Sequence, residues 1–295
     1  MQSFSRVTTL PPHITSTNVG VIAHEVIGQE IPDSLDIDCS RLTTIQSCGI
    51  AYLGNITEWL LNQSCQVNFT GLGENSSPAI DELRDAGFVA RCCGALQSNR
   101  LNPLIFPLES ITRAKSRPYV EAEFIPWLAG QTGYLIDHLS GLHGALAELF
   151  NNVEDHTEYD VGCLHARHYP EDKRVLVTVA DFGCGIPYNV LRLEPNLSEA
   201  AAIVKATQLK FTTGGQRNRG MGLDQVLTHV IKLNQGVVTI RSGKGSVAFS
   251  ADSDEIGNKE LACQGRCFGT MIEISVPTNR EKWFGGNEGP EDFGW

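Results

Sequence analysis

The stretch KRVLVTVADFGCGIP, residues 173–187, decides the fold of the second half of this chain. From Val175 onward the residues are almost all apolar, which predicts a strand. The run ends at Asp181, and Gly183 and Gly185 then break the extended chain. A carboxylate at a strand end, beside flexible glycines, can accept a hydrogen bond from an exocyclic amine. The end of this strand is therefore a candidate binding position.

A long amphipathic helix is predicted before this strand, because apolar residues recur at helical spacing from Leu135 to Val153. The same helix carries Glu148, Asn152 and Asp155, whose i, i+4, i+7 spacing places them on one face. Carboxylates beside apolar neighbours cost free energy unless a cation or a polar ligand compensates. The spacing alone fits a solvated helix edge equally well, so both interpretations stay open.

A glycine-rich loop comes after the strand. TTGGQRNRGMGL, residues 212–223, runs into a helix expected over 223–234. The backbone N–H groups of such a loop, together with the helix N-terminus, can cradle phosphate. Glycine pairs are usually only turns, so each of these patterns is a weak signal by itself. Their order, and their placement on a helix, a strand end and a loop, make the combination specific.

The combination resembles the GHKL ATPase family, which includes gyrase B-type enzymes, Hsp90, MutL, histidine kinases and anti-sigma-factor serine kinases. The resemblance covers about residues 130–278. ELFNNVEDH is similar to the N-box, DFGCGIP to the G1 box, GGQRNRGMGL to the G2 box and FGTMIEISVP to the closing strand. The resemblance implies an α/β sandwich, in which a mixed sheet with helices on one face holds ATP under a mobile lid.

The resemblance also implies roles for individual residues. Asn152 stands where the family binds Mg²⁺, and its amide oxygen is a hard ligand for that ion. Asp181 matches the aspartate that accepts the adenine amino group, and Thr270 matches a threonine near adenine. The implied nucleotide-binding set is completed by Asp155 and by six glycines: Gly183, Gly185, Gly214, Gly215, Gly220 and Gly222.

Two further segments follow from the same resemblance. Residues 188–219 correspond to the lid, and its Lys210, Arg217 and Arg219 could each reach the γ-phosphate. The sequence does not choose among these three. The family usually closes soon after SGKGS, whereas here an insertion over about residues 250–267 precedes the closing strand. We expect this insertion to extend the sheet as a hairpin.

Glu148 separates the branches of the family. Gyrase-type enzymes and anti-sigma-factor serine kinases resemble this chain in having Glu at this position, where it can activate water or a hydroxyl. Histidine kinases typically have Asn there. His138 and His143 lie on the same helix as Glu148, too close to it to act as the phosphoacceptor. We therefore expect an ATP-dependent serine kinase or ATPase, and not a histidine kinase.

The first third alternates strand and helix patterns, which predicts a small α/β unit. Strands are expected over 34–40 and 65–72, and helices over 48–63 and 77–88. SLDIDCSRLTTIQSCGIAYL resembles a STAS domain, the fold of anti-sigma-factor antagonists, in which a DSSG-like turn carries a regulated serine. The matching QSCG places Ser47 at that position as the candidate phosphoacceptor. A hydroxyl at a helix N-terminus is also an ordinary cap, so both roles stay open.

The composition is that of an ordinary soluble protein. The 295 residues carry a net charge of −11 without a Lys/Arg-rich block, so nucleic acid and anionic membranes are poor candidate partners. No apolar run approaches the ~20 residues that a membrane span needs, and the N-terminus lacks the apolar core of a signal peptide. These patterns predict a cytoplasmic protein, in which the 9 cysteines are mostly free thiols.

The fold class expected for the chain is α/β, divided into four segments. They are a STAS-like domain over 1–95, a connector over 96–125, a GHKL ATP-binding domain over 126–280 and a flexible acidic and aromatic tail over 281–295.

Three functions fit this organisation. The resemblance favours an ATP-binding regulatory protein of the anti-sigma-factor kinase type, which would phosphorylate a STAS-like partner or Ser47 of its own or a neighbouring chain. One alternative is an ATPase conformational switch in which Glu148 activates water. The other is a non-catalytic nucleotide-sensing module. All three imply ATP with Mg²⁺ and a regulatory protein partner, and they leave a homodimer open.

Overall fold

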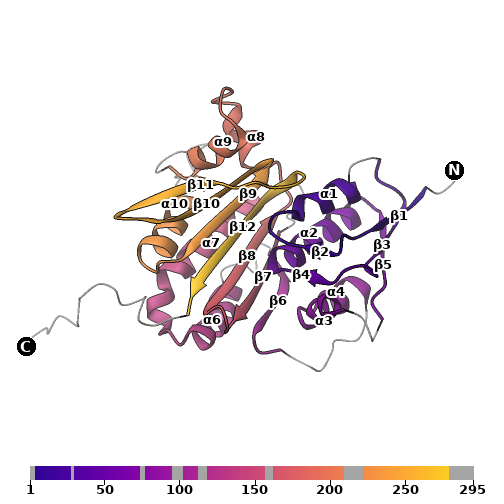
Figure 1. Cartoon of the computed structure of the whole chain (residues 1–295), viewed down its shortest axis with the longest axis horizontal. Coiled ribbons are helices and arrows are strands. Elements are labelled where there is room, and N and C mark those ends of the chain that lie inside the picture. The colour runs from indigo at the N-terminus through magenta and orange to yellow at the C-terminus, as the bar shows by residue number, and fades with distance from the viewer. Residues whose placement is uncertain are drawn as a thin grey trace, which may run out of the picture.

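The computed structural model places an N-terminal part, indigo to purple in Figure 1, beside a larger sheet with its own helices. The residues it describes are 4–27, 30–73, 77–94, 102–111, 118–156, 162–208 and 222–278. Among these residues no helix combines the length and the apolar character that crossing a bilayer requires. The α/β fold class expected from the sequence is confirmed in both parts.

The N-terminal part is a small parallel sheet with four helices. Its strands are β1 (Ser5–Thr9), β3 (Ser34–Asp38) and β5 (Gln66–Thr70), paired in the order β1-β3-β5, with the short parallel pair β2 (His13–Ile14) and β4 (Thr44–Ile45) beside them. Its helices are α1 (Val19–Ile27), α2 (Ser47–Asn62), α3 (Pro78–Asp85) and α4 (Phe88–Cys93). The strands and helices expected here are confirmed. The helix expected over 77–88 ends earlier, as α3, because Gly87 adopts a left-handed conformation with φ +75°.

The larger part is built on a seven-stranded sheet in the order β11-β10-β9-β12-β8-β7-β6. Its strands are β6 (Ile105–Ser110), β7 (Gly162–Tyr169), β8 (Arg174–Asp181), β9 (Val237–Gly243), β10 (Gly245–Asp252), β11 (Glu255–Glu260) and β12 (Cys267–Pro277). Every pairing between these strands is antiparallel, whereas a mixed sheet was expected. Strand β6 falls inside the expected connector, yet it pairs with β7 as the edge of this sheet.

Helices of the larger part cover one face of the sheet (Figure 1). They are η1 (Val120–Phe124), α6 (Ile125–Thr132), η2 (Ile136–Leu139), α7 (Ser140–His156), α8 (Ile186–Leu191), α9 (Glu199–Ala206), α10 (Gly222–Leu227) and η3 (Thr228–Lys232). The long predicted helix is confirmed as α7, although a short 3₁₀ turn, η2, replaces its first residues. The helix predicted after the glycine-rich loop is confirmed as α10 with its continuation η3.

Both faces of the central strands are buried. Successive side chains of a strand point to opposite faces of the sheet, so each strand contributes to two cores. In β8, Val175, Val177 and Val179 belong to the core beneath the helices. Thr178 is fully buried on the opposite face, and Ala180 belongs to the core that includes the N-terminal part. We call this second face, which carries His165, Thr178, Ala180 and Met271, the docking face. The nearly continuous apolar run of β8 follows from this double burial.

Helix α2 covers the docking face and packs against β7 and β8. Twelve of its residues are buried, which is the pattern of a helix enclosed on nearly every side. A Cβ at Gly54 would lie 2.9 Å from Leu108 Cδ2 and 3.3 Å from Cys163 Sγ, so the helix approaches the large sheet closely there. Full burial of a large apolar side chain contributes roughly 1.5–3 kcal/mol. Tyr52 of α2 is fully buried, and its ring contacts Phe182 of the larger part. Burial of α2 against the larger part therefore helps to hold the two parts together.

The insertion over residues 250–267 contributes β11, which pairs with β10 as the expected hairpin extension. Its returning loop contacts the N-terminal part. Gln264 N donates to Thr17 O at 2.8 Å, and Gly20 forms a parallel bridge with Gly265. The insertion therefore provides a second contact between the two parts, beside α1.

Candidate functional site

Asp181 ends β8 as the sequence predicts, and two backbone amides fix its carboxylate. Gly183 N donates to Asp181 Oδ1 at 2.9 Å, and Thr270 N donates to the same oxygen at 3.0 Å. Charge-assisted hydrogen bonds of this kind are roughly twice as strong as neutral ones. The structure thus brings together three residues predicted for the site, from the end of β8 and from β12.

The surroundings of Asp181 shift its acidity. Burial raises the pKa of the carboxyl to about 6, although the hydrogen bonds from Gly183 and Thr270 act in the opposite direction. Above that pH the group is a carboxylate, which accepts hydrogen bonds and donates none. Perturbed carboxyls of this kind are common at ligand sites, although ion-pair networks also produce them.

A bulge in β12 places Thr270 against Asp181. The pairing register between β12 and β9 shifts between Cys267 and Thr270, and Gly269 in this bulge has φ +72°. A Cβ on Gly269 would lie 2.3 Å from Asp181 O and 2.6 Å from Asp181 Oδ1. The position therefore requires glycine for both conformation and space.

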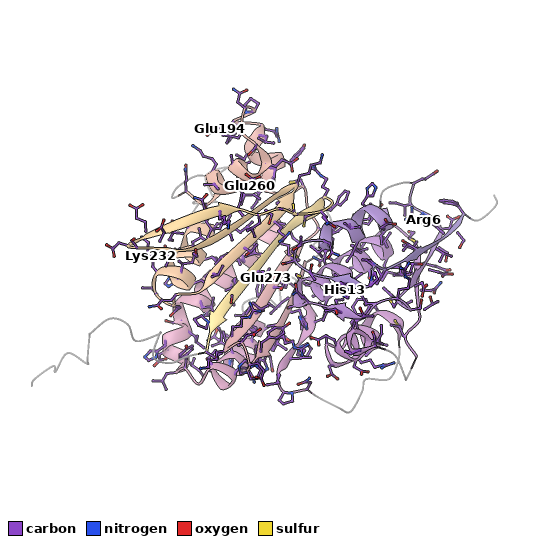
Figure 2. All side chains as sticks on the ribbon, viewed as in Figure 1. Arg6, His13, Glu194, Lys232, Glu260 and Glu273 are labelled. Atoms are coloured by element: carbon purple, nitrogen blue, oxygen red, sulfur yellow. The ribbon has the colours of Figure 1, made fainter. Side chains whose placement is uncertain are left out.

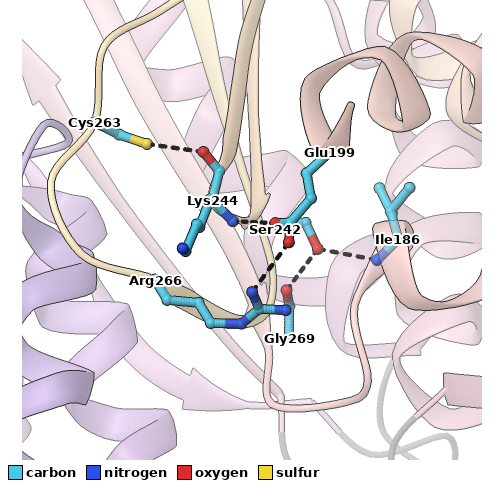
Figure 3. Close-up of polar contacts among 7 residues, drawn as sticks. All are labelled: Ile186, Glu199, Ser242, Lys244, Cys263, Arg266 and Gly269. Atoms are coloured by element: carbon cyan, nitrogen blue, oxygen red, sulfur yellow. Dashed lines mark hydrogen bonds and ion pairs between the residues drawn. The ribbon is translucent and has the colours of Figure 1, made fainter. Parts of the chain in front are cut away.

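Ser242, at the end of β9, ties the bulge to the start of α8, as Figure 3 shows. Its hydroxyl donates to Gly269 O at 2.7 Å and accepts from Ile186 N at 2.9 Å. A Cβ at Gly185, where φ is +80°, would lie 2.6 Å from Ser242 Oγ, so this predicted glycine is needed for close packing. The sequence patterns did not predict Ser242 as a site residue. The one feature that could have indicated it is a hydroxyl directly before the GKG turn at residues 243–245.

Glu199, in the first turn of α9, is the centre of a second group of polar contacts in Figure 3. Its carboxylate forms an ion pair with Arg266 at 3.0 Å and accepts from Lys244 N. Cys263 Sγ lies 3.3 Å from Lys244 O as a donor. These contacts join α9, the β9–β10 turn and the insertion. They were also missed, because the partners lie 45 and 67 residues from Glu199 in the chain.

Several predicted site residues cannot be compared with the structure. Helix α7 carries Glu148, Asn152 and Asp155 at the expected spacing, but their side chains lie outside the described residues. Gly214, Gly215 and Gly220, the lid cations Lys210, Arg217 and Arg219, and the tail 281–295 also lie outside them, while Gly222 begins α10. The magnesium ligand and the phosphate cradle therefore stay predictions.

Ser47 lies in the contact between the two parts and is fully buried. Its Oγ is 2.7 Å from His165 Nδ1, and Thr178 Oγ1 donates to it at 3.2 Å. Of the two roles left open for Ser47, the N-cap is wrong, because Gln46 is the N-cap residue of α2 and no side chain makes a cap hydrogen bond there. The Ser47 hydroxyl instead forms its hydrogen bonds with His165 and Thr178 on the docking face.

A half-buried carboxylate also lies against the docking face. Figure 2 labels Glu273 over the middle of the large sheet. Burial raises the pKa of the Glu273 carboxyl, and the guanidinium groups of Arg241 and Arg174 oppose that rise. Arg241 is buried beside it. The contact between the two parts therefore contains polar and charged groups as well as apolar ones.

Two comparisons with known proteins found matches. Residues 137–278 match the family model described as histidine kinase-, DNA gyrase B- and HSP90-like ATPase. This segment is therefore similar to GHKL-type ATPase domains. A crystal structure of the B-subunit of the DNA gyrase from Myxococcus xanthus is a structural neighbour, with 8% identity and a TM-score of 0.23. The match covers 38% of this chain and 30% of the gyrase chain. No curated protein matches the chain.

Proposed function

We propose that the chain is an ATP-operated regulatory switch, in which the nucleotide state of the GHKL-type domain sets how the N-terminal part or a protein partner is held. The observation that carries the proposal is the Asp181 carboxylate, which two backbone amides hold at the end of β8. Asp181 lies in the segment that matches an ATPase family model. The resemblance of DFGCGIP to the G1 box implies that this carboxylate would accept the adenine amino group.

The residues around Asp181 fit an adenine nucleotide. The carboxylate can accept hydrogen bonds from the exocyclic amine of adenine. Thr270 N donates to this carboxylate, and Ser242 donates to Gly269 O in the adjacent bulge, so both residues hold the backbone beside Asp181 in place. Asn152 would hold Mg²⁺ through its amide oxygen, and the glycines of the 214–222 loop would bind phosphate through their backbone amides. Glu148 would orient and activate the attacking water or hydroxyl.

The position of Ser47 favours a conformational switch over self-phosphorylation. Ser47 contacts Thr178 on the docking face, whereas Asp181, an odd number of residues further along β8, belongs to the opposite side-chain row. A buried hydroxyl behind the sheet is out of reach of a nucleotide at Asp181 of the same chain. Serine kinase activity, which Glu148 allows, would therefore act on a partner protein.

The substitution Asp181→Asn tests the nucleotide assignment. The Asn oxygen can still accept from Gly183 and Thr270, but its NH₂ group then faces the adenine amine as a second donor. We expect ATP affinity to fall about 10- to 100-fold, which corresponds to the loss of one hydrogen bond to a charged group. Isothermal titration calorimetry measures this. Asp172→Asn, at an exposed site, is the matched control, and equal ATP affinities in all three proteins would contradict ATP binding at Asp181.

Incubation with Mg-ATP separates the switch from the self-kinase. We expect free phosphate release that Glu148→Ala abolishes, with no phosphate on Ser47 of the native chain, because the docked α2 keeps its hydroxyl buried. Phosphopeptide mass spectrometry and a phosphate assay on the same sample provide the readout. Stoichiometric phosphoserine at position 47 would refute this version and favour the self-kinase. Transfer to an added STAS-domain protein would instead identify a kinase that acts on a partner.

A further inference from the structure

A tyrosine of the N-terminal part contacts the segment that is proposed to bind nucleotide. Tyr52 lies in the middle of α2 and is fully buried. Its hydroxyl accepts from Phe268 N at 2.7 Å and lies 3.5 Å from Phe268 O as a donor. Phe268 is the residue just before the Gly269 bulge, so the N-terminal part binds the backbone of β12 next to Asp181.

The rings of the same residues form a continuous contact. Tyr52 lies 6.0 Å from Phe182 between ring centroids. Trp59, two turns further along the same face of α2, lies 5.4 Å from Phe182. Phe182 also stacks on Phe268 at 6.0 Å. Phe182 follows Asp181 directly in the chain, and Phe268 precedes Gly269. Helix α2 therefore packs against both segments that hold the carboxylate.

We propose that Tyr52 is a positioning residue of the adenine site, an inference that rests on the function proposed above and names a part of the site contributed by the N-terminal part. Its hydroxyl fixes the backbone of Phe268. The following residues are thereby held so that Gly269 fits against Asp181 O and Thr270 N reaches Asp181 Oδ1. Undocking of α2 would release this bulge, and adenine binding would favour the docked arrangement in return.

The hydroxyl has a defined role because a buried backbone amide needs a partner. Phe268 N lies in the irregular part of β12, where the ladder with β9 is interrupted between Cys267 and Thr270. Tyr52 supplies the acceptor that the interrupted ladder does not. Replacing Tyr52 with Phe removes that acceptor and keeps the ring contacts with Phe182, so the substitution isolates the hydroxyl.

The test compares ATP with inosine triphosphate, ITP, which carries an oxygen in place of the adenine amino group. In the full-length chain, we expect the wild type to prefer ATP over ITP by about 10- to 100-fold. Tyr52→Phe should lower this preference about 3- to 10-fold and change ITP affinity less than twofold. A general loosening of the fold would weaken both nucleotides together, and that outcome would overturn the assignment.

Thr178→Val is the matched control, because it removes a hydroxyl from the contact between the two parts without touching Phe268. It should keep the wild-type ATP preference, and an equal loss in both variants would overturn the assignment. If Tyr52→Phe does not fold, Trp59→Phe provides the test through Phe182, with an expected loss of about twofold, and an unchanged preference would overturn the proposal.

The result also separates this inference from the proposed function. A wild-type chain that binds neither nucleotide overturns both. A wild-type preference for ATP that Asp181→Asn removes, and that Tyr52→Phe leaves intact, overturns only the role of Tyr52.

Discussion

Gly269→Ala should abolish most ATP binding while leaving the chain folded. The new Cβ would lie 2.3 Å from Asp181 O and 2.6 Å from Asp181 Oδ1, which is closer than atoms can approach. Because both contacts are to the segment that carries the carboxylate, the bulge or Asp181 must move. The hydrogen bond from Thr270 N to Asp181 is then lost or lengthened, and ATP affinity should fall about 100-fold, near the limit for one charged hydrogen bond.

The loss of stability in this variant should leave the chain folded. A non-glycine residue at φ +72° costs about 1–3 kcal/mol, which a domain of ordinary stability, about 5–15 kcal/mol, can tolerate. Calorimetric titration with ATP and urea unfolding on the same preparation measure both quantities. Gly130→Ala is the matched control, since Gly130 is exposed in α6 with nothing within 4 Å of its Cβ position. Retained ATP affinity in Gly269→Ala would contradict the importance of the bulge.

Part of this site could be predicted from sequence because its signals are local. The apolar run of β8, its terminal Asp181 and the glycines that follow are consecutive in the chain. Strand, acceptor and turn therefore follow from neighbouring residues. Helix α7 was equally predictable, since one apolar row repeats along it. Helix α2 was predictable in the same way, from the helical spacing of its own apolar residues.

The rest depends on contacts between residues distant in the chain. Ser242 acts at the site only because β9 pairs with β12 and brings it to Gly269. In the sequence, Tyr52 is indistinguishable from the other buried residues of α2. Its hydrogen-bond partner Phe268 lies 216 residues away in the chain, so no local pattern indicates the contact. Ser47 shows how a local pattern can mislead. A hydroxyl in the first turn of a helix suggests a cap, whereas its partners are His165 and Thr178 of the large sheet.

The contact between Ser47 and His165 should make the docked structure sensitive to acid. Burial lowers the pKa of His165 from 6.5 to about 3, and its Nε2 has no hydrogen-bond partner among the described residues. The folded chain therefore keeps this imidazole neutral, whereas the unfolded chain protonates it below pH 6.5. Stability from this group is fully present above pH 6.5 and is lost as the pH falls toward 3, by about 1.4 kcal/mol per pH unit.

Carboxyl groups act in the opposite direction, so the wild type alone does not isolate this effect. The pKa of Asp181 is raised to about 6 and that of Glu273 is also raised. These groups therefore stabilise the folded chain as the pH falls and they become protonated. A comparison with His165→Gln cancels their contribution, because both proteins contain the same carboxyls.

We expect His165→Gln to be less stable than the wild type by about 1–3 kcal/mol at pH 7.5, since Gln refills the position imperfectly beside Ser47. This difference should shrink by about 1.4 kcal/mol for each pH unit below 6.5 and reverse near pH 5. Urea unfolding from pH 7.5 to pH 4.5 measures it. Thr178→Val, in which neither side chain titrates, should differ from the wild type by the same amount at every pH. A pH-independent difference for His165→Gln would mean that His165 is not held neutral, and the α2 contact would then have no acid-sensitive group at Ser47.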